Sequence, residues 1–309
     1  MDKYTDVYQK VTDIITAKLE SGLVPWQRPW DIETGIPTNL ISKRPYQGIN
    51  VLLLSSLEFE SQYFLSFKQA RELGGTVKKG EKACLVVFKK WIEATDKDGN
   101  IVYNDKGNSK NVPMLRYYYV FNIQQCAGIP EDKIPKKEQK ERKHVPTMEA
   151  EAIATKMPNR PKIKYGSQKA SYSPTDDIVS MPRKELFHST EELYSTLFHE
   201  MVHSTGHSSR LDRPGVMKSS GFGSDEYSRE ELVAEMGAAF LCANAGIEGR
   251  TINNSASYIS SWLERLKKDK RLVVIAAGTA QKACDFILNK KAKESENEGN
   301  AFGEKSKAA

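Results

Sequence analysis

The sequence predicts a two-domain α+β protein whose second domain holds a metal site. Three observations support this fold class. The chain has 309 residues, 39% of them hydrophobic, which is enough for two packed cores. Its first half mixes helix-like and strand-like apolar patterns. Its second half follows a strongly charged segment and contains the pattern His-Glu-x-x-His at residues 199–203.

An amphipathic helix is predicted at the N-terminus, because apolar side chains recur there at intervals of three and four residues. Gly22 should end this helix. The apolar positions are Tyr4, Val7, Val11, Ile14, Ile15 and Leu19.

The rest of the first domain alternates between short helical and extended segments. A short apolar run at 51–54 precedes a helix predicted at 66–73, which Gly74-Gly75 closes. Residues 84–91 and 115–123 are rich in β-branched and aromatic side chains and are predicted as strands. Between them, Asp98-Gly99-Asn100 predicts a turn. Because the whole connection is long, we expect it to include an extra hairpin or a mobile loop.

A charged segment separates the two domains. Residues 133–143 carry six basic and two acidic side chains and almost no apolar ones, which predicts a solvated linker. A basic clamp for phosphates is the alternative interpretation. We therefore expect a first domain at 1–130, a basic linker at 131–146 and a second domain at 147–289. The polar tail at 290–309 leaves nothing to bury and should be disordered.

The segment Phe198-His199-Glu200-Met201-Val202-His203 is typical of a zinc hydrolase. An α-helix turns once in about 3.6 residues, so His199 and His203 project from one face and can bind one metal ion. Glu200 is then placed to take the proton of a water that the metal makes acidic. Zinc is the expected metal, with manganese or iron as alternatives. The competing interpretation is a surface helix with incidental histidines.

The residues around the motif predict an amphipathic helix. Ser189 and Glu192 form a capping box at its start, and Gly206 should end it. The buried stripe at four-residue spacing consists of Leu193, Leu197 and Met201.

The third metal ligand decides the subclass of the site. In the form H-E-x-x-H-x-x-G-x-x-H the last position is a histidine, but this chain has Ser209 there, so that form is excluded. His207 lies one turn beyond His203. Gly206 intervenes and should turn the backbone away, so we rank His207 below a carboxylate as a ligand and expect it to contact substrate.

A second helix, predicted at 227–240, offers that carboxylate. Its alanine and glycine residues permit close packing against another helix, and Glu231 and Glu235 share a face at four-residue spacing. We predict Glu231 as the third ligand and Glu235 as the group that orients a histidine, as in the glutamate zincins. Alternatively, Glu231 serves a capping box that starts at Ser228, and Glu235 is the ligand.

Charge and cysteine content bear on the possible partners and the cellular compartment of the protein. A formal net charge of +6 is compatible with nucleic acid but too small to establish it. The four cysteines show no C-x-x-C spacing and are expected to be reduced core residues. The sequence has neither an apolar run of about 18 residues nor a signal peptide, so we expect a soluble, cytoplasmic protein without a membrane partner.

Aromatic and cationic side chains alternate in the first domain and predict contacts with single-stranded DNA. Bases stack on aromatic rings, and cations hold the phosphates without reading sequence. Some of these rings should instead pack in the core, because alternate strand residues face inward. The candidates are Trp26, Arg28 and Trp30 in one loop, Lys43, Arg44 and Tyr46 in another, and Lys89, Lys90, Trp91, Arg116, Tyr117 and Tyr119 on strands.

The second domain also predicts a place for a protein or peptide substrate. Residues 177–182 form a predicted strand that ends at a proline before the metal helix, and such an edge strand can pair with an extended peptide. Tyr227, His207 and Arg210 are candidates for stabilising the oxyanion that forms when water attacks a carbonyl. Glu200, Tyr227 and His207 are thus the predicted catalytic residues.

Taken together, these segments resemble the ArdC-type antirestriction proteins over nearly residues 3–290. The resemblance rests on the His199 segment with its Ser204-Thr205-Gly206-His207 extension, the Glu231 helix, and residues 22–30 (GLVPWQRPW), 45–50 (PYQGIN), 67–70 (FKQA) and 79–82 (KGEK). It implies an N-terminal single-stranded-DNA-binding domain and a zincin-like metallopeptidase domain. It also implies a protein of plasmids and other mobile elements that shields incoming DNA from host restriction.

Three functions therefore fit the sequence. The first is an antirestriction factor that binds single-stranded DNA and carries a zinc-dependent metallopeptidase site. The second is a cytoplasmic zinc metallopeptidase whose first domain binds a protein partner. The third is a DNA-protecting protein whose metal site does not hydrolyse anything.

Overall fold

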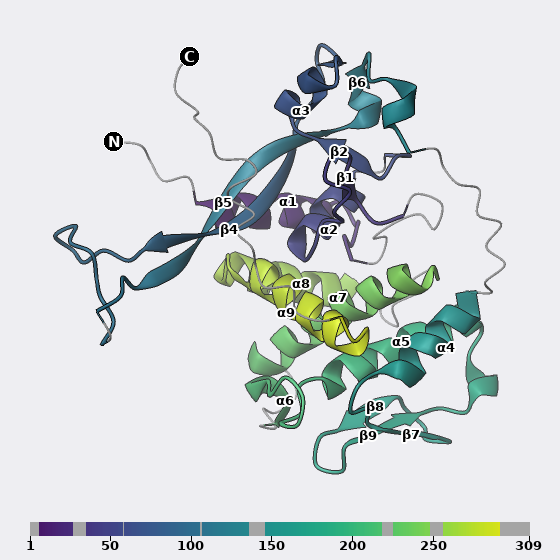
Figure 1. Cartoon of the computed structure of the whole chain (residues 1–309). Helices are drawn as coiled ribbons and strands as arrows, with labels where there is room; N and C mark the ends of the chain where they lie inside the picture. The colour runs from purple at the N-terminus through teal and green to yellow at the C-terminus, as the bar shows by residue number, and fades with distance from the viewer. Residues whose placement is uncertain are drawn as a thin grey trace.

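The structure is a computed structural model, and it describes residues 6–26, 35–57, 59–105, 107–135, 146–217, 225–247 and 256–290. It contains two α+β parts, one built around a four-stranded sheet and the other around packed helices with a three-stranded sheet (Figure 1). The predicted α+β class with two domains is confirmed. None of the helices described is both long and apolar enough to cross a bilayer.

The first part has a mixed sheet with the strand order β1-β2-β5-β4 and a separate pair of β3 with β6. Strands β1 and β2 are parallel, whereas β5 is antiparallel to both β2 and β4. Its elements are α1 (Val7–Glu20), β1 (Thr38–Asn39), α2 (Ile49–Ser55), β2 (Tyr63–Leu65), α3 (Phe67–Glu72), β3 (Thr76–Val77), β4 (Cys84–Glu93), β5 (Asn111–Asn122), β6 (Cys126–Ala127) and the 3₁₀ turns η1 (Ile123–Gln125) and η2 (Glu131–Lys133).

Local sequence signals mark the ends of α1 and α3, and α3 lies where it was predicted. Tyr4, the first apolar position of the predicted N-terminal helix, lies outside the described residues. The Asp6 carboxylate accepts a hydrogen bond from the Gln9 amide at 3.2 Å and caps α1. Ser66 and Gln69 form a complete capping box at the start of α3. Gly74 follows the end of α3 with a φ of 82°, a left-handed conformation that favours glycine.

Strands β4 and β5 form a long antiparallel ribbon that packs on α1 and α2 at one end and projects beyond the helices at the other (Figure 1). Its register runs from Cys84 opposite Val120 to Glu93 opposite Asn111. Beyond this ladder, isolated bridges join Thr95 to Ile101 and Tyr103 to Ser109. The connection therefore contains an extra hairpin, one of the two arrangements expected from its length.

The second part surrounds α5 and α7 with further helices and places a sheet of order β7-β9-β8 against α5. Its elements are α4 (Pro146–Lys156), β7 (Lys162–Tyr165), β8 (Ser171–Ser173), β9 (Ile178–Met181), η3 (Lys184–Leu186), α5 (Thr190–Ser204), α6 (Pro214–Met217), α7 (Asp225–Ala245), α8 (Ala256–Lys268) and α9 (Leu272–Ile287).

Strand β9 is the central strand of this sheet. It pairs in parallel with β7 and antiparallel with β8, so both of its edges are hydrogen-bonded. The prediction that residues 177–182 form a free edge for a peptide is therefore wrong. A period-two apolar pattern marks a strand, but the position of that strand in its sheet depends on partners elsewhere in the chain.

The two parts share one hydrophobic core. Val11 of α1 and Leu52 of α2 belong to the same buried cluster as Ala277 of α9. Across this junction the Trp26 ring packs edge-on against the Trp262 ring, with 5.0 Å between their centroids. Helices α1 and α2 thus cover the helical part as well as the sheet of their own part. All four cysteines are buried and free, as predicted.

Candidate metal centre

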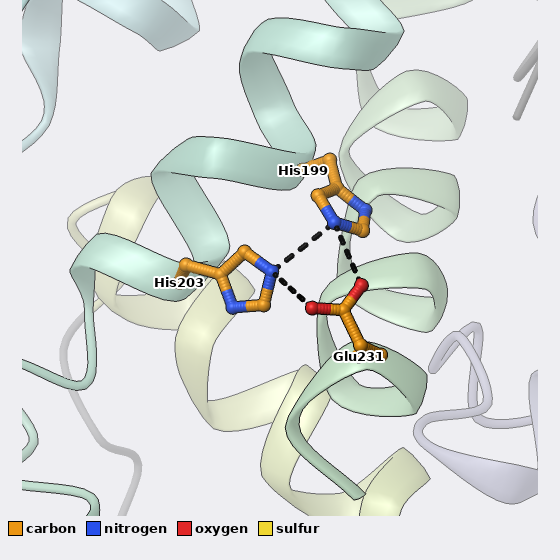
Figure 2. A group of neighbouring side chains, drawn as sticks. All are labelled: His199, His203 and Glu231. Carbon is orange, nitrogen blue, oxygen red and sulfur yellow. Dashed lines mark hydrogen bonds and ion pairs between the residues drawn. The ribbon is translucent and has the colours of Figure 1, made fainter. Parts of the chain in front are cut away.

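Helix α5 carries the two histidines and is anchored by its apolar face. The Ser189 hydroxyl accepts a hydrogen bond from the Glu192 amide at 3.1 Å and caps the helix start. Leu197 and Met201 of the predicted stripe are buried, as is Leu193. With this face fixed, His199 and His203 project together toward α7 (Figure 2).

A glycine is needed at position 206, just after α5, but for a different reason than predicted. It does not adopt a left-handed backbone, so it does not turn the chain in the manner of a helix-capping glycine. A Cβ at this position would lie 2.4 Å from Cγ2 of Val216. Glycine is required here because the segment after the helix folds back against the helix end.

Helix α7 approaches α5 closely at a second glycine. A Cβ on Gly237 would lie 2.7 Å from Cγ2 of Val202, which is too short for any real contact. The small residues of this helix therefore permit close packing, as predicted. Because α7 begins at Asp225, Ser228 lies inside the helix. Glu231 is thus free of the capping-box role that was its alternative interpretation.

Three side chains converge between these helices. His199 Nε2 and His203 Nε2 lie 3.1 Å apart. The two oxygens of Glu231 lie 3.5 Å from these nitrogens, one oxygen facing each ring (Figure 2). All three ligand atoms fall within 4.8 Å of one another. Two imidazole nitrogens and one carboxylate form a donor set that suits Zn²⁺ and other first-row divalent ions.

A second layer of carboxylates faces the other nitrogen of each ring. Glu235 Oε1 lies 3.9 Å from His199 Nδ1, and Glu230 Oε1 lies 3.4 Å from His203 Nδ1. Arg213 forms an ion pair with Glu230, and its Nε donates to Glu230 Oε2 at 3.1 Å. Carboxylates in this position hold the tautomer and orientation of a metal-binding histidine.

Sequence reasoning found Glu235 but missed Glu230 and Arg213. Glu235 shares the helix face of Glu231, so helical spacing indicates it. Glu230 precedes Glu231 directly, and neighbouring helix residues point in different directions. Arg213 comes from a loop outside α7. The one signal in the sequence for Glu230 is that two adjacent glutamates occur near the start of a helix rich in small residues.

The carboxylates make this site strongly attractive to a cation. Burial alone would lower the pKa of His199, but its hydrogen bond to Glu231 and the charges of Glu235 and Glu200 raise it to about 9. Burial would raise the pKa of Glu231, yet the hydrogen bond to His199 and nearby positive charge lower it. Glu235 Oε2 is buried and has no hydrogen-bond partner among the described residues. A divalent ion fits the charge that these groups bring together.

The predicted catalytic residues differ in their distance from this cluster. Glu200 is buried beside His199, and its charge acts on the His199 ring. The Tyr227 side chain hydrogen-bonds to Glu231 and so lies next to the third ligand. His207 Nδ1 lies 2.8 Å from the Ser209 hydroxyl, and the ring is not one of the three side chains that converge in the cluster. Its contact with a substrate stays a prediction.

Arg210 is a structural residue, and its predicted role in stabilising an oxyanion is wrong. Its buried guanidinium uses all five N–H groups within the protein. The acceptors are Ser204 O at 2.7 Å, Asn159 O at 2.8 Å, Tyr172 Oη at 3.1 Å and both carboxylate oxygens of Asp177. No donor remains for a substrate.

One DNA-binding candidate of the first loop, Trp26, is unavailable to bases. Trp26 is fully buried against Trp262, so the prediction that it stacks on DNA is wrong. The physical reason is that its ring fills the junction between the two parts. Arg28 and Trp30 lie outside the described residues.

The remaining DNA-binding candidates occupy two separate surfaces. Lys43 and Arg44 are exposed on a turn, where Lys43 Nζ lies 5.6 Å from the Tyr63 ring, while Tyr46 is half-buried against Phe64. Lys89 and Arg116 are exposed on the ribbon but belong to its opposite faces.

Comparisons with known proteins agree with both halves of this description. Residues 5–121 match the model of the N-terminal domain of anti-restriction factor ArdC, and residues 148–279 match that of a zincin-like metallopeptidase. The crystal structure of antirestriction protein ArdC from plasmid R388, in its metal-free form, is 37% identical, with a TM-score of 0.71 over 92% of this chain and 97% of that one. The chain belongs to the ArdC family of antirestriction proteins.

Two other relatives of this ArdC-type chain differ from each other in length: one matches it over most of both proteins, and the other is much longer. Protein y4eC of Sinorhizobium fredii (strain NBRC 101917 / NGR234) is 31% identical over 290 residues, which cover 92% of each protein. DNA primase TraC of Escherichia coli is 32% identical over 297 residues, or 91% of this chain. The chain spans only 27% of that primase. The R388 ArdC has also been crystallised with Mn(II), and that form has a TM-score of 0.68 to this chain.

Proposed function

We propose that this protein is an antirestriction factor of a mobile genetic element, which binds single-stranded DNA through its first part and carries a metallopeptidase-type site in its second. The observation that carries the metal function is the convergence of two imidazoles of α5 with Glu231 of α7, together with Glu200 on α5. The relatives named as a plasmid antirestriction protein and a DNA primase support the DNA role. Four buried thiols fit a reducing compartment, so we place the protein in the cytoplasm.

His199, His203 and Glu231 would hold the metal ion, and we propose zinc, with manganese or iron as alternatives. Manganese is the ion bound in one R388 ArdC structure. A divalent ion in such a site supplies a Lewis acid and lowers the pKa of water. Glu200 takes the proton of the attacking water, while Glu235 and Glu230 hold the histidine rings. The Tyr227 hydroxyl, which hydrogen-bonds to Glu231, would turn to donate instead to the oxygen of a substrate carbonyl. The proposed substrate is a protein or peptide.

The hydrolytic role is tested by Glu200→Ala in a restriction-protection assay. DNA would be transferred into a restricting host with wild type or variant present, and metal content would be measured by elemental analysis. If hydrolysis underlies protection, the variant keeps its metal but loses most of its protection. Undiminished protection with full metal content would instead establish the second candidate, a DNA-protecting protein with a non-catalytic metal site.

The DNA role is tested by the affinity of the wild-type protein for a labelled single strand as a function of salt. Cations that contact phosphates release counterions, so binding should weaken as salt rises. The absence of binding at low salt would exclude the DNA role. A metallopeptidase whose first part binds a protein partner would then be the better description.

A further inference from the structure

The β4–β5 ribbon presents two chemically different faces. Successive strand residues point to opposite sides, and residues directly opposite each other share a side. The register therefore sorts the aromatic and cationic side chains into two groups. The odd face, named after its residue numbers, carries Lys89, Trp91, Tyr117 and Tyr119, and the even face carries Phe88, Lys90, Arg116 and Tyr118.

The odd face combines exposed rings with cations. Trp91 is 50% exposed and Tyr119 is 45% exposed. Tyr117 lies between them but is half-buried against the main hydrophobic cluster, with its ring centroid 5.6 Å from that of Tyr119. Lys10 of α1 reaches over the Tyr117 ring, with its Nζ 5.2 Å from the centroid, and exposed Lys89 precedes Trp91 by two residues. The exposed rings of Tyr119 and Trp91 thus lie on either side of two ammonium groups along this face.

The even face uses its rings for packing. Phe88 and Tyr118 are half-buried, and their rings stack edge-on with 5.7 Å between centroids. Tyr118 also packs on the buried cluster that contains Phe64 and Val86. Exposed cations remain on this face, but no aromatic residue that the structure describes there is exposed. The even face can therefore attract phosphates but offers no platform for bases.

We propose that single-stranded DNA lies along the odd face, with bases stacked on Trp91 and Tyr119 and phosphates held by Lys89 and Lys10. The proposal rests on the DNA-binding function proposed above. Side chains two residues apart on one strand face repeat at about 6.8 Å. Tyr119 is paired with Leu85, so its ring and that of Trp91 lie three such repeats apart, on the order of 20 Å, a span that several nucleotides of one strand can cover. Only a single strand can stack its bases on such rings, because the bases of a duplex are stacked inside it. Of the aromatic candidates from the sequence, Trp91 and Tyr119 thus keep the proposed stacking role, whereas buried Trp26 does not.

A matched pair of variants tests this assignment. Lys89 and Lys90 are adjacent, equally charged and both exposed, but they lie on opposite faces. The affinity of each full-length variant for a labelled oligothymidine would be measured by fluorescence anisotropy at several salt concentrations. We expect Lys89→Ala to bind several-fold more weakly and to reduce the log–log salt slope by about 0.7, the value for one phosphate contact on a single strand. Lys90→Ala should match wild type.

Stacking is tested separately by Trp91→Ala, which should weaken binding roughly 10-fold without a change in salt slope. Tyr103→Ala is the control, because Tyr103 is also an exposed aromatic residue but lies in the extra hairpin beyond the ribbon. This variant should bind as wild type does. Unchanged melting temperature and metal content would show that each variant is folded. Equal losses in Lys89→Ala and Lys90→Ala, or wild-type affinity of Trp91→Ala, would overturn the assignment. A loss confined to Lys43→Ala and Arg44→Ala would also do so, whereas wild type that binds no DNA would refute the proposed function itself.

Discussion

The carboxylate of Glu230 joins Arg213 to His203. Its Oε1 lies 3.4 Å from His203 Nδ1, and the Arg213 guanidinium pairs with the same oxygen. Arg213 also donates to Thr205 Oγ1 at 2.5 Å and to Val202 O at 2.8 Å, so it is hydrogen-bonded to the last turn of α5 and to its C-cap residue. Burial would raise the pKa of Glu230, but its bonds to His203 and Arg213 lower it, so the carboxylate stays ionised. The ion pair therefore sets the orientation of a metal-binding ring.

Replacing Glu230 by Gln should weaken metal affinity by about 10- to 100-fold, because the acceptor that orients His203 loses its negative charge and its ion pair with Arg213. The measurement is a competition titration of the metal-free protein with Mn²⁺ or Zn²⁺ against a chelating indicator. Glu226→Gln, at an exposed position of the same helix, is the control and should bind metal normally. Equal affinities of the two variants would show that Glu230 does not position the ring.

Replacing Glu231 by Ala should remove most of the bound metal, since this carboxylate faces both Nε2 atoms. Glu235→Gln should only weaken binding, because Glu235 faces Nδ1 of His199. Elemental analysis of the purified variants measures the difference, with Glu226→Ala as the reference. Glu230 is not a suitable neutral control, because it contacts His203. Greater metal loss in the Glu235 variant would make that residue the ligand.

Gly237→Ala and Gly278→Ala should have opposite effects on stability. Both glycines lie within helices, where alanine is intrinsically favoured by about 1 kcal/mol. Around Gly278 a Cβ meets nothing within 4 Å, so Gly278→Ala should be neutral or stabilising. At Gly237 a Cβ would strike Val202 and separate α5 from α7, at a cost of about 1–3 kcal/mol. Thermal unfolding measures both effects, and metal affinity should fall only in Gly237→Ala.

Asp177→Asn should remove a pH-dependent part of the stability. Burial would raise the pKa of Asp177, but hydrogen bonds from Arg210 and Tyr172 lower it below its usual value. A carboxylate with a lowered pKa stabilises the fold above its unfolded-state pKa and loses this effect as the pH falls through its folded-state pKa. We expect the variant to be less stable near pH 7 by about 1.5–3 kcal/mol and the difference to shrink below about pH 4.

Thermal unfolding from pH 3 to pH 7 measures this dependence. Asparagine suits the test because, like aspartate, it tolerates the positive φ of 51° at this position. Asp176→Asn, at the neighbouring exposed carboxylate, is the control. A stability difference that does not change with pH would mean that the ionised carboxylate of Asp177 contributes nothing to the fold.

Much of the metal site follows from local patterns. The spacing of His199 and His203 places both on one helix face whatever surrounds the helix, and Ser189 begins that helix through a hydrogen bond three residues away. Glu231 lies on a second helix whose small residues predict close packing. These features depend on helical geometry and on contacts within a few residues, so they could be derived from the sequence.

The tertiary structure decided which side chains face the site, the core and the solvent. Arg213 reaches Glu230 across 17 positions, and Arg210 reaches Asp177 across 33. Trp26 fits the fold only as a partner of Trp262, so its burial could not be predicted from its own loop. The pairing of β4 with β5 placed Lys89 and Lys90 on different faces. Such features depend on strand register and long-range packing, which no local pattern in the sequence determines.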